Sequence, residues 1–106
     1  VFAFYATVTD VKQRLSIPTT TRLYPNYPNP FNASTTLRLE LAQPGRVELV
    51  VFDILGRHIK TLIKEDKAAG EYAVVWNATN VPSGLYFVKL IVNNNVIKTT
   101  KMLLVK

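Results

Sequence analysis

The sequence predicts an all-β fold, a seven-stranded antiparallel β-sandwich, from two observations. Hydrophobic residues recur at every second position through most of the chain, as they do in strands that bury one face. Short polar segments rich in Asn, Pro and Gly separate these stretches at regular intervals, which is typical of the turns in a sandwich. No segment shows the spacing of an amphipathic helix, so the sequence indicates strands throughout.

Three strands are predicted in the first part of the chain. Residues 35–41 form the first strand, because leucines alternate there with polar side chains, and residues 47–52 resume the alternation. A Pro-Gly pair at residues 44–45 lies between them and indicates a type II turn. A tight connection around Gly56, which can adopt a positive φ, leads to a third strand at residues 59–63.

The second part of the chain predicts a charged loop followed by three more strands. Residues 64–70 are polar and indicate the loop. In residues 72–76 the larger side chains fall on one face, which predicts a strand with Trp76 in the core. Residues 85–92 and 96–105 form a closing hairpin. Apolar residues occur on both faces of its last strand, as expected inside a sheet or between two layers.

Residues 1–18 lie outside this pattern and form either a linker or an edge strand from the preceding region. The Thr run at residues 19–21 marks the boundary, so residues 19–106 form one immunoglobulin-like domain. The chain begins without Met and without a basic segment before its apolar residues. This start differs from a secretory signal peptide and predicts a fragment whose N-terminus lies upstream.

The composition argues against several functions. The 13 Lys and Arg residues give a net charge of +6, but they are spread singly and do not predict a nucleic-acid patch. There is no Cys and a single His, His58, too few ligands for a transition-metal site built from nitrogen and sulfur. Ser34 and Ser83 lack a nearby His or acid, and no carboxylates form a convincing pair. We therefore expect neither an enzyme nor a cofactor or small-molecule substrate.

The most informative motif lies at residues 24–32, which hold three Asn, three Pro and three aromatic residues. These residues exclude a regular helix or strand and predict a rigid turn whose aromatic and Pro side chains pack onto the sandwich. The segment Y-P-N-Y-P-N-P-F-N-A-S-T-T resembles the opening motif of the type A C-terminal sorting domain of type IX secretion cargo. The usual form of that motif is Y-P-N-P-F-N-P-S-T-T-I, so Ala33 departs from it.

Two further motifs follow in the family's order, and the resemblance covers residues 23–106. Residues 82–86 resemble its P-S-G-x-Y motif, and residues 101–106 resemble its terminal K-x-x-x-x-K strand. The end of the printed chain at the second Lys of this strand favours a sorting role. The sorting-motif residues that the resemblance implies are Pro28, Asn29, Pro30, Phe31, Asn32, Gly84, Tyr86, Lys101 and Lys106.

The resemblance implies that the domain is an address with no chemistry of its own. After export to the periplasm of a bacterium, the outer-membrane secretion machinery would recognise the monomeric domain and carry its N-terminal cargo to the cell surface or beyond. A surface sortase-like cysteine peptidase would then remove the domain, and the cargo would be released or joined to anionic lipopolysaccharide. The alternative is an accessory immunoglobulin-like or carbohydrate-binding module of an extracellular enzyme, with Trp76 as a platform for sugar rings.

The scarcity of metal ligands leads to a first prediction. We expect the domain to fold without a metal ion, so a chelator such as EDTA should leave the midpoint of thermal unfolding unchanged. Differential scanning calorimetry with and without the chelator measures this. A large drop in the midpoint would reveal a structural metal ion and contradict the prediction.

Overall fold

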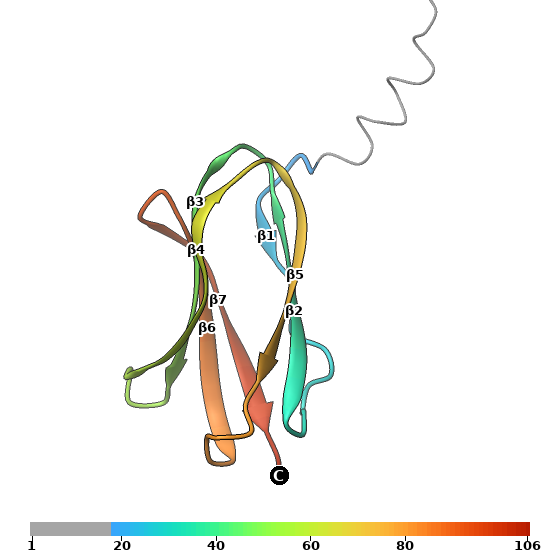
Figure 1. Cartoon of the computed structure of the whole chain (residues 1–106), viewed down its shortest axis with the longest axis vertical. Coiled ribbons are helices and arrows are strands. Elements are labelled where there is room, and N and C mark those ends of the chain that lie inside the picture. The colour runs from blue at the N-terminus through green and yellow to red at the C-terminus, as the bar shows by residue number, and fades with distance from the viewer. Residues whose placement is uncertain (1–17) are drawn as a thin grey trace, which may run out of the picture.

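Residues 18–106 of the computed structural model form two antiparallel β-sheets that pack face to face (Figure 1). The smaller sheet has the order β1-β2-β5 and the larger sheet the order β4-β3-β6-β7. The strands are β1 (Arg22–Leu23), β2 (Ser34–Leu41), β3 (Gly45–Asp53), β4 (His58–Lys67), β5 (Gly70–Asn77), β6 (Gly84–Val92) and β7 (Asn95–Leu104). The predicted seven-stranded immunoglobulin-like sandwich is confirmed. These residues include no helix long and apolar enough to cross a membrane.

The chain crosses between the two sheets at three connections. Residues 42–44 join β2 to β3, residues 68–69 join β4 to β5, and residues 78–83 join β5 to β6. Hairpins join β3 to β4 and β6 to β7 within the larger sheet. Gly56 has a φ of 81° in the first hairpin, as predicted, and residues 93–94 have φ values of 51° and 68° in the second. Positive φ at both central residues produces a turn whose twist matches that of the flanking strands.

The core lies between the sheets and is built from the alternating side chains of both. Every second residue of β2 is buried, and the same alternation runs through β3 and β6. Trp76 is 3% exposed and belongs to this core, so its predicted position is confirmed. The fully buried side chains include Leu37, Leu39, Leu41, Val47, Leu49, Val51, Val88, Leu90, Met102 and Leu104.

The predicted loop at residues 64–70 is wrong except for residues 68–69, because β4 continues through the charged run. Lys64 lies opposite Glu48 of β3, and a second pair of opposite charges follows two positions further along the ladder. Opposite charges at facing positions favour strand pairing even where the apolar alternation stops. The charged run is therefore the solvent-facing end of an edge strand.

The predicted type II turn at residues 44–45 is also wrong. Gly45 begins β3 and is not among the residues with positive φ, which a type II turn would require of it. The strands on either side belong to different sheets, so the chain has to cross the sandwich here and cannot reverse onto its own neighbour.

The last strand does not lie inside a sheet, because β7 is at the edge of the larger one. Met102 and Leu104 point into the core, whereas Leu103 and Val105 are 38% and 50% exposed. Apolar residues on both faces of this strand therefore reflect an apolar outer surface. The seventh strand is β1, which the alternation did not predict. The edge strand considered for residues 1–18 lies outside the described residues except for Pro18, which belongs to no strand.

Asp53 is the last residue of β3, and its side chain holds the turn of the β3–β4 hairpin in place. Its Oδ1 accepts hydrogen bonds from the backbone N–H groups of Leu55 and Arg57, each 2.9 Å long. Its Oδ2 accepts a hydrogen bond of 2.7 Å from Arg57 Nε. Burial raises the pKa of the Asp53 carboxyl. The hydrogen bonds and the charge of Arg57 outweigh that effect and hold the pKa below its ordinary value of 3.8.

The lowered pKa predicts how Asp53 contributes to stability as the pH changes. A carboxyl whose pKa is lower in the folded state stabilises the fold above its unfolded pKa, and this contribution is lost as the pH falls through the folded pKa. We expect Asp53→Asn to lower the free energy of unfolding at pH 7 and the difference to shrink below about pH 4. Urea denaturation of both proteins at several pH values measures this. An equal difference at pH 7 and at low pH would contradict it.

Candidate functional site

The three predicted motifs meet at one end of the sandwich, where β2 begins and β7 ends (Figure 1). Phe31 of the first motif pairs in parallel with Leu104 of the last. Phe31 N donates to Leu103 O and Val105 N donates to Phe31 O, both at 2.9 Å. The first motif therefore closes the outer edge of β7 over its last residues, an edge that would otherwise expose unpaired backbone groups.

Asn29 extends this contact with its side chain. Its Oδ1 accepts a hydrogen bond of 3.0 Å from Leu103 N, one pairing position before the Phe31 bridge. Asn29 and Phe31 thus occupy successive backbone groups of β7, although more than seventy residues separate them from it. The side-chain oxygen of Asn29 thus accepts the hydrogen bond that a backbone carbonyl of a neighbouring strand would accept.

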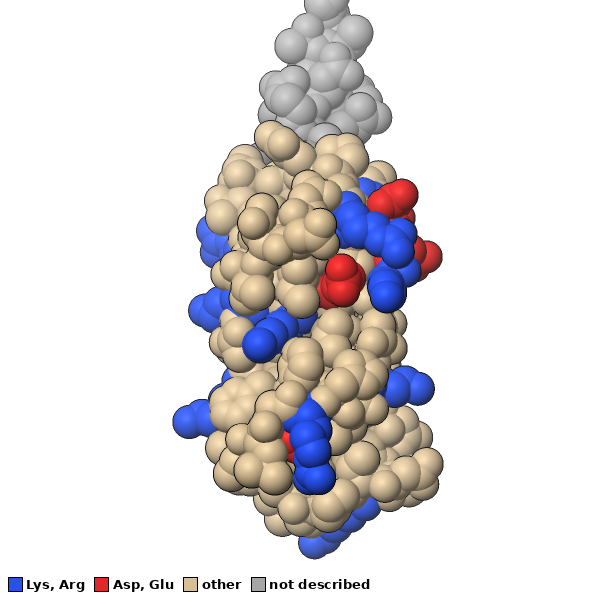
Figure 2. Space-filling model, turned by 90° about the vertical axis from the view of Figure 1, so that its left-hand side faces the viewer, with Lys and Arg blue, Asp and Glu red and all other residues tan. Residues whose placement is uncertain are grey.

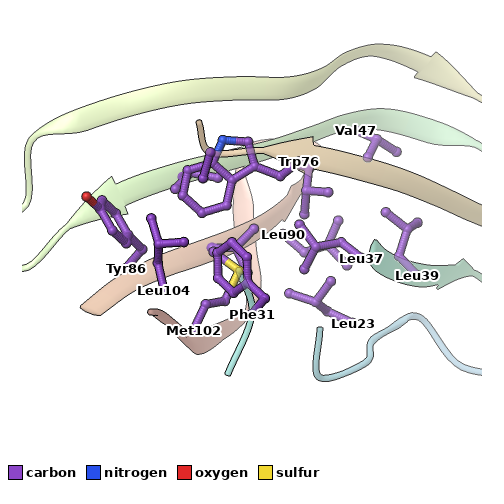
Figure 3. Packing of buried hydrophobic residues seen from close by; sticks show 14 of the residues in the cluster. Leu23, Phe31, Leu37, Leu39, Val47, Trp76, Tyr86, Leu90, Met102 and Leu104 are labelled. Carbon is purple, nitrogen blue, oxygen red and sulfur yellow. The ribbon is translucent and has the colours of Figure 1, made fainter. Parts of the chain in front are cut away.

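The Phe31 ring is 2% exposed and joins an aromatic cluster (Figure 3). Its centroid lies 5.6 Å from that of Trp76, and Trp76 lies 5.4 Å from Tyr86 with the two rings nearly perpendicular. Both distances are in the range of favourable tilted and edge-to-face contacts. Because Phe31, Trp76 and Tyr86 come from different parts of the chain, the cluster joins the first motif to the second.

The prediction that the first motif packs onto the sandwich is only partly correct. Phe31 is buried and Tyr24 is half-buried, but Tyr27 is 81% exposed. The prolines at 25, 28 and 30 are exposed as well. The segment is held chiefly by one ring and by hydrogen bonds, and not by its full set of aromatic and Pro side chains.

A buried Asn fixes the shape of this segment, and the sequence analysis did not identify it. Asn26 is 3% exposed, and its Nδ2 donates to Pro28 O at 3.1 Å and to Thr35 Oγ1 at 3.0 Å. Thr35 Oγ1 in turn donates to Pro28 O at 2.8 Å. Pro28 contributes through its carbonyl, while its ring faces solvent. The sequence did contain a signal for this contact, because Thr35 occupies the first inward position of a strand that follows a polar turn.

The second motif forms a tyrosine corner, a feature of immunoglobulin-like sandwiches. Tyr86 lies near the start of β6, and its hydroxyl donates a 2.6 Å hydrogen bond to Pro82 O. Burial, and to a smaller extent the charge of Asp53, raise the pKa of this hydroxyl, which keeps it a donor. Gly84, between them, has a φ of 150°, a conformation that residues with a side chain rarely adopt.

The two lysines of the last motif have different surroundings. Lys106 N donates to Ser83 Oγ at 3.0 Å, and Lys106 Nζ donates to Thr79 O at 2.7 Å. Lys106 therefore ties the end of the chain to the loop that carries the second motif. Lys101 lies apart from this cluster, on the outer face of the larger sheet opposite Phe87. Asn32 and Pro30 are exposed beside Phe31.

This end of the domain presents a surface whose shape is fixed by internal contacts. Several of its polar side chains form hydrogen bonds to the protein itself, namely those of Asn29, Thr35, Tyr86 and Lys106, whereas Asn26 Oδ1 is buried without a partner in the described part of the chain. Within residues 18–106, no three His, Cys, Asp or Glu side chains come together in a group that could hold a metal ion. Trp76 is buried and offers no platform to a sugar ring, which removes the feature that had suggested a carbohydrate-binding module.

The fold, with its three motifs joined at one end, defines a small immunoglobulin-like β-sandwich module. The family of domains to which it belongs is in general non-catalytic. Residues 24–106 match the model of the secretion system C-terminal sorting domain, and the chain belongs to that family. The resemblance of the three motifs to this family is thus confirmed. A comparison with curated proteins found no match to this chain.

Two solved structures resemble the chain. PorZ of Porphyromonas gingivalis is described as an essential bacterial surface component of the type IX secretion system. It superposes with a TM-score of 0.54 at 19% identity. The match covers 81% of this chain but only 11% of PorZ, and at that identity it shows the fold alone. The Pseudomonas fluorescens alkylpurine DNA glycosylase AlkC matches with a TM-score of 0.47 at 15% identity, over 92% of this chain and 34% of the enzyme.

The aromatic cluster predicts that Phe31 contributes strongly to stability. Phe31→Ala would leave a cavity beside Trp76 and should lower the free energy of unfolding by about 3–5 kcal/mol. Urea denaturation followed by Trp fluorescence measures this change.

Tyr27→Ala is the matched control, because it removes an exposed aromatic ring from the same motif. We expect it to change the free energy of unfolding by less than about 0.5 kcal/mol. Equal effects of the two substitutions would show that the Phe31 ring does not hold the motif in place.

Proposed function

We propose that this domain is a C-terminal secretion signal that directs an attached cargo protein through the outer membrane by the type IX machinery. The observation that carries the proposal is the convergence of three family motifs at one end of the sandwich. A signal that depends on residues so far apart in sequence exists only in the folded domain. The machinery would therefore read folded structure and not a linear peptide.

The positions of the chain ends support this role. The described chain starts at Pro18, at the end of the sandwich opposite to the motifs, and Lys106 lies at the motif end (Figure 1). In this proposal residues 19–106 are the sorting domain and residues 1–18 connect it to the cargo. Cargo attached on that side would leave the motif end accessible to the outer-membrane machinery.

The sorting-motif residues would divide into two roles. Asn29, Phe31, Gly84, Tyr86 and Lys106 would build the motif end through their internal contacts. Pro28, Pro30, Asn32 and Lys101 expose their side chains and would contact the machinery. After transit through the periplasm, a surface sortase-like peptidase would cleave the domain from its cargo, leaving the cargo at the cell surface or outside the cell. The domain would act as a monomer without catalytic activity.

The C-terminal strand offers a test of this function. Removal of residues 101–106 would take Met102 and Leu104 out of the core and the Phe31 pairing with them. We expect a reporter fused before this truncated domain to stay in the periplasm of a bacterium that has type IX secretion. The intact fusion should reach the cell surface, which fractionation and surface labelling measure.

The matched control separates folding from recognition. Lys101→Gln with Lys106→Gln removes two charges but keeps every apolar residue of β7. We expect this variant to fold, with a loss of stability of about 1 kcal/mol from the weakened Lys106 contact, and to be exported more slowly. Export of the truncated fusion at the full rate would show that this strand is not part of a sorting signal.

A further inference from the structure

The outer face of the larger sheet carries an aromatic row that the core does not use. The register of the four strands aligns His58, Phe52, Phe87 and Lys101 side by side. Phe52 and Phe87 alternate with buried neighbours, so their rings point away from the core, and both remain partly exposed. Within residues 18–106, no other strand covers this face.

The row borders a hollow with a volume of about 250 Å³. Phe52, Phe87 and Ile54 supply its apolar surface, with Lys89 and Thr99 at its side. Ile54 is 70% exposed at the tip of the β3–β4 hairpin, and Lys89 Nζ lies 4.8 Å from the centre of the Phe52 ring. The hollow therefore combines an apolar floor with a cation placed over an aromatic ring.

The charges around this hollow are almost all positive. Glu48 and Asp66, on the same sheet, pair across the ladder with Lys64 and Arg46 at the Gly45 end of β3, far from the hollow. One carboxylate, that of Asp53, lines the hollow itself, and Arg57 Nε lies 2.7 Å from its Oδ2 and offsets its charge. In Figure 2 most of the acidic atoms on this face lie toward the upper end, and the small acidic area in the lower half lies beside a basic side chain.

Lys89 and Lys101 flank Phe87 and form no ion pair within the described residues. The lower half of the face thus offers positive charge beside exposed apolar surface. A complementary surface has to supply negative charge and an apolar group together.

We propose that this hollow is a docking site for a protein of the secretion machinery. The occupant is a segment that places one large apolar side chain over Phe52 and Phe87 and its carboxylates against Lys89 and Lys101. This inference rests on the proposed function, since it names the chemistry of the partner. It also gives Lys101, the one motif lysine outside the tied cluster, a contact of its own.

The binding test uses the full chain and a defined probe, a short peptide in which a single Phe is flanked by Glu on both sides. Two control peptides carry Lys in place of Glu, or Ala in place of Phe. In NMR titrations of the ¹⁵N-labelled chain we expect saturable shifts at Phe52, Phe87 and Thr99 with the first peptide only. Absent shifts, equal shifts with all three peptides, or shifts confined to other residues would overturn the proposal.

Charge reversal tests whether Lys89 and Lys101 determine the binding of the acidic peptide. Lys89→Glu with Lys101→Glu should weaken binding of the acidic peptide about tenfold or more. Lys98→Glu is the control. Lys98 is an exposed lysine of β7, as Lys101 is, but it lines a different groove together with Arg22 and Tyr24. We expect it to change the affinity by less than about twofold. Each Lys→Glu substitution changes the net charge by −2, so the double variant changes it twice as much as the control. A loss with Lys98→Glu of about half the binding free energy that the double variant loses would mean that only the net charge matters, and would overturn the proposal.

Two further measurements separate the alternatives. Sedimentation with phosphatidylglycerol vesicles tests a membrane partner, and vesicle binding that needs Lys89 and Lys101 without peptide binding would overturn the docking proposal. In the secretion assay, failure of the unaltered fusion to leave the periplasm would contradict the proposed function and leave the peptide result to decide this site. Export of the unaltered fusion and of Lys89→Glu/Lys101→Glu at equal rates would contradict this inference alone.

Discussion

The arrangement of the motif end depends on the pairing of Phe31 with the last residues of β7. Phe31 leads into β2 of the smaller sheet, whereas β7 belongs to the larger one, so two backbone hydrogen bonds join the two layers directly. The same pairing carries the Phe31 ring into contact with Trp76 and completes the core at this end. Backbone satisfaction and apolar burial therefore coincide at one residue.

This coincidence explains how a structural motif can also be a signal. Tyr86, Lys106 and Asn29 each hold a neighbouring segment through hydrogen bonds. The bonds of Asn29 to Leu103 and of Lys106 to Ser83 join two motifs, and the bond of Tyr86 to Pro82 closes a motif on itself. The exposed residues beside them keep their positions only while these bonds persist. A receptor that contacts the exposed set would therefore distinguish folded domains from unfolded ones without touching the core.

The sequence predicted most strands because a half-buried strand has to alternate, and the alternation in β2, β3 and β6 is nearly complete. It failed at the charged end of β4, where backbone pairing with β3 continues and the facing residues carry opposite charges. It also misplaced β7, because an apolar outer face and an interior position give the same pattern. The motifs could be identified from sequence, but their convergence could not. The Phe31–Leu104 pairing joins residues too far apart for any local pattern to indicate.

The opposite positions of Pro18 and the motif end also have a mechanical consequence. A force applied between cargo and receptor would run along the strands, from one end of the sandwich to the other (Figure 1). In that direction the ladder hydrogen bonds, which lie perpendicular to the strands, are loaded in shear and have to break together and not one by one. In the proposed role, this geometry would let a small domain resist tension while its cargo is drawn behind it.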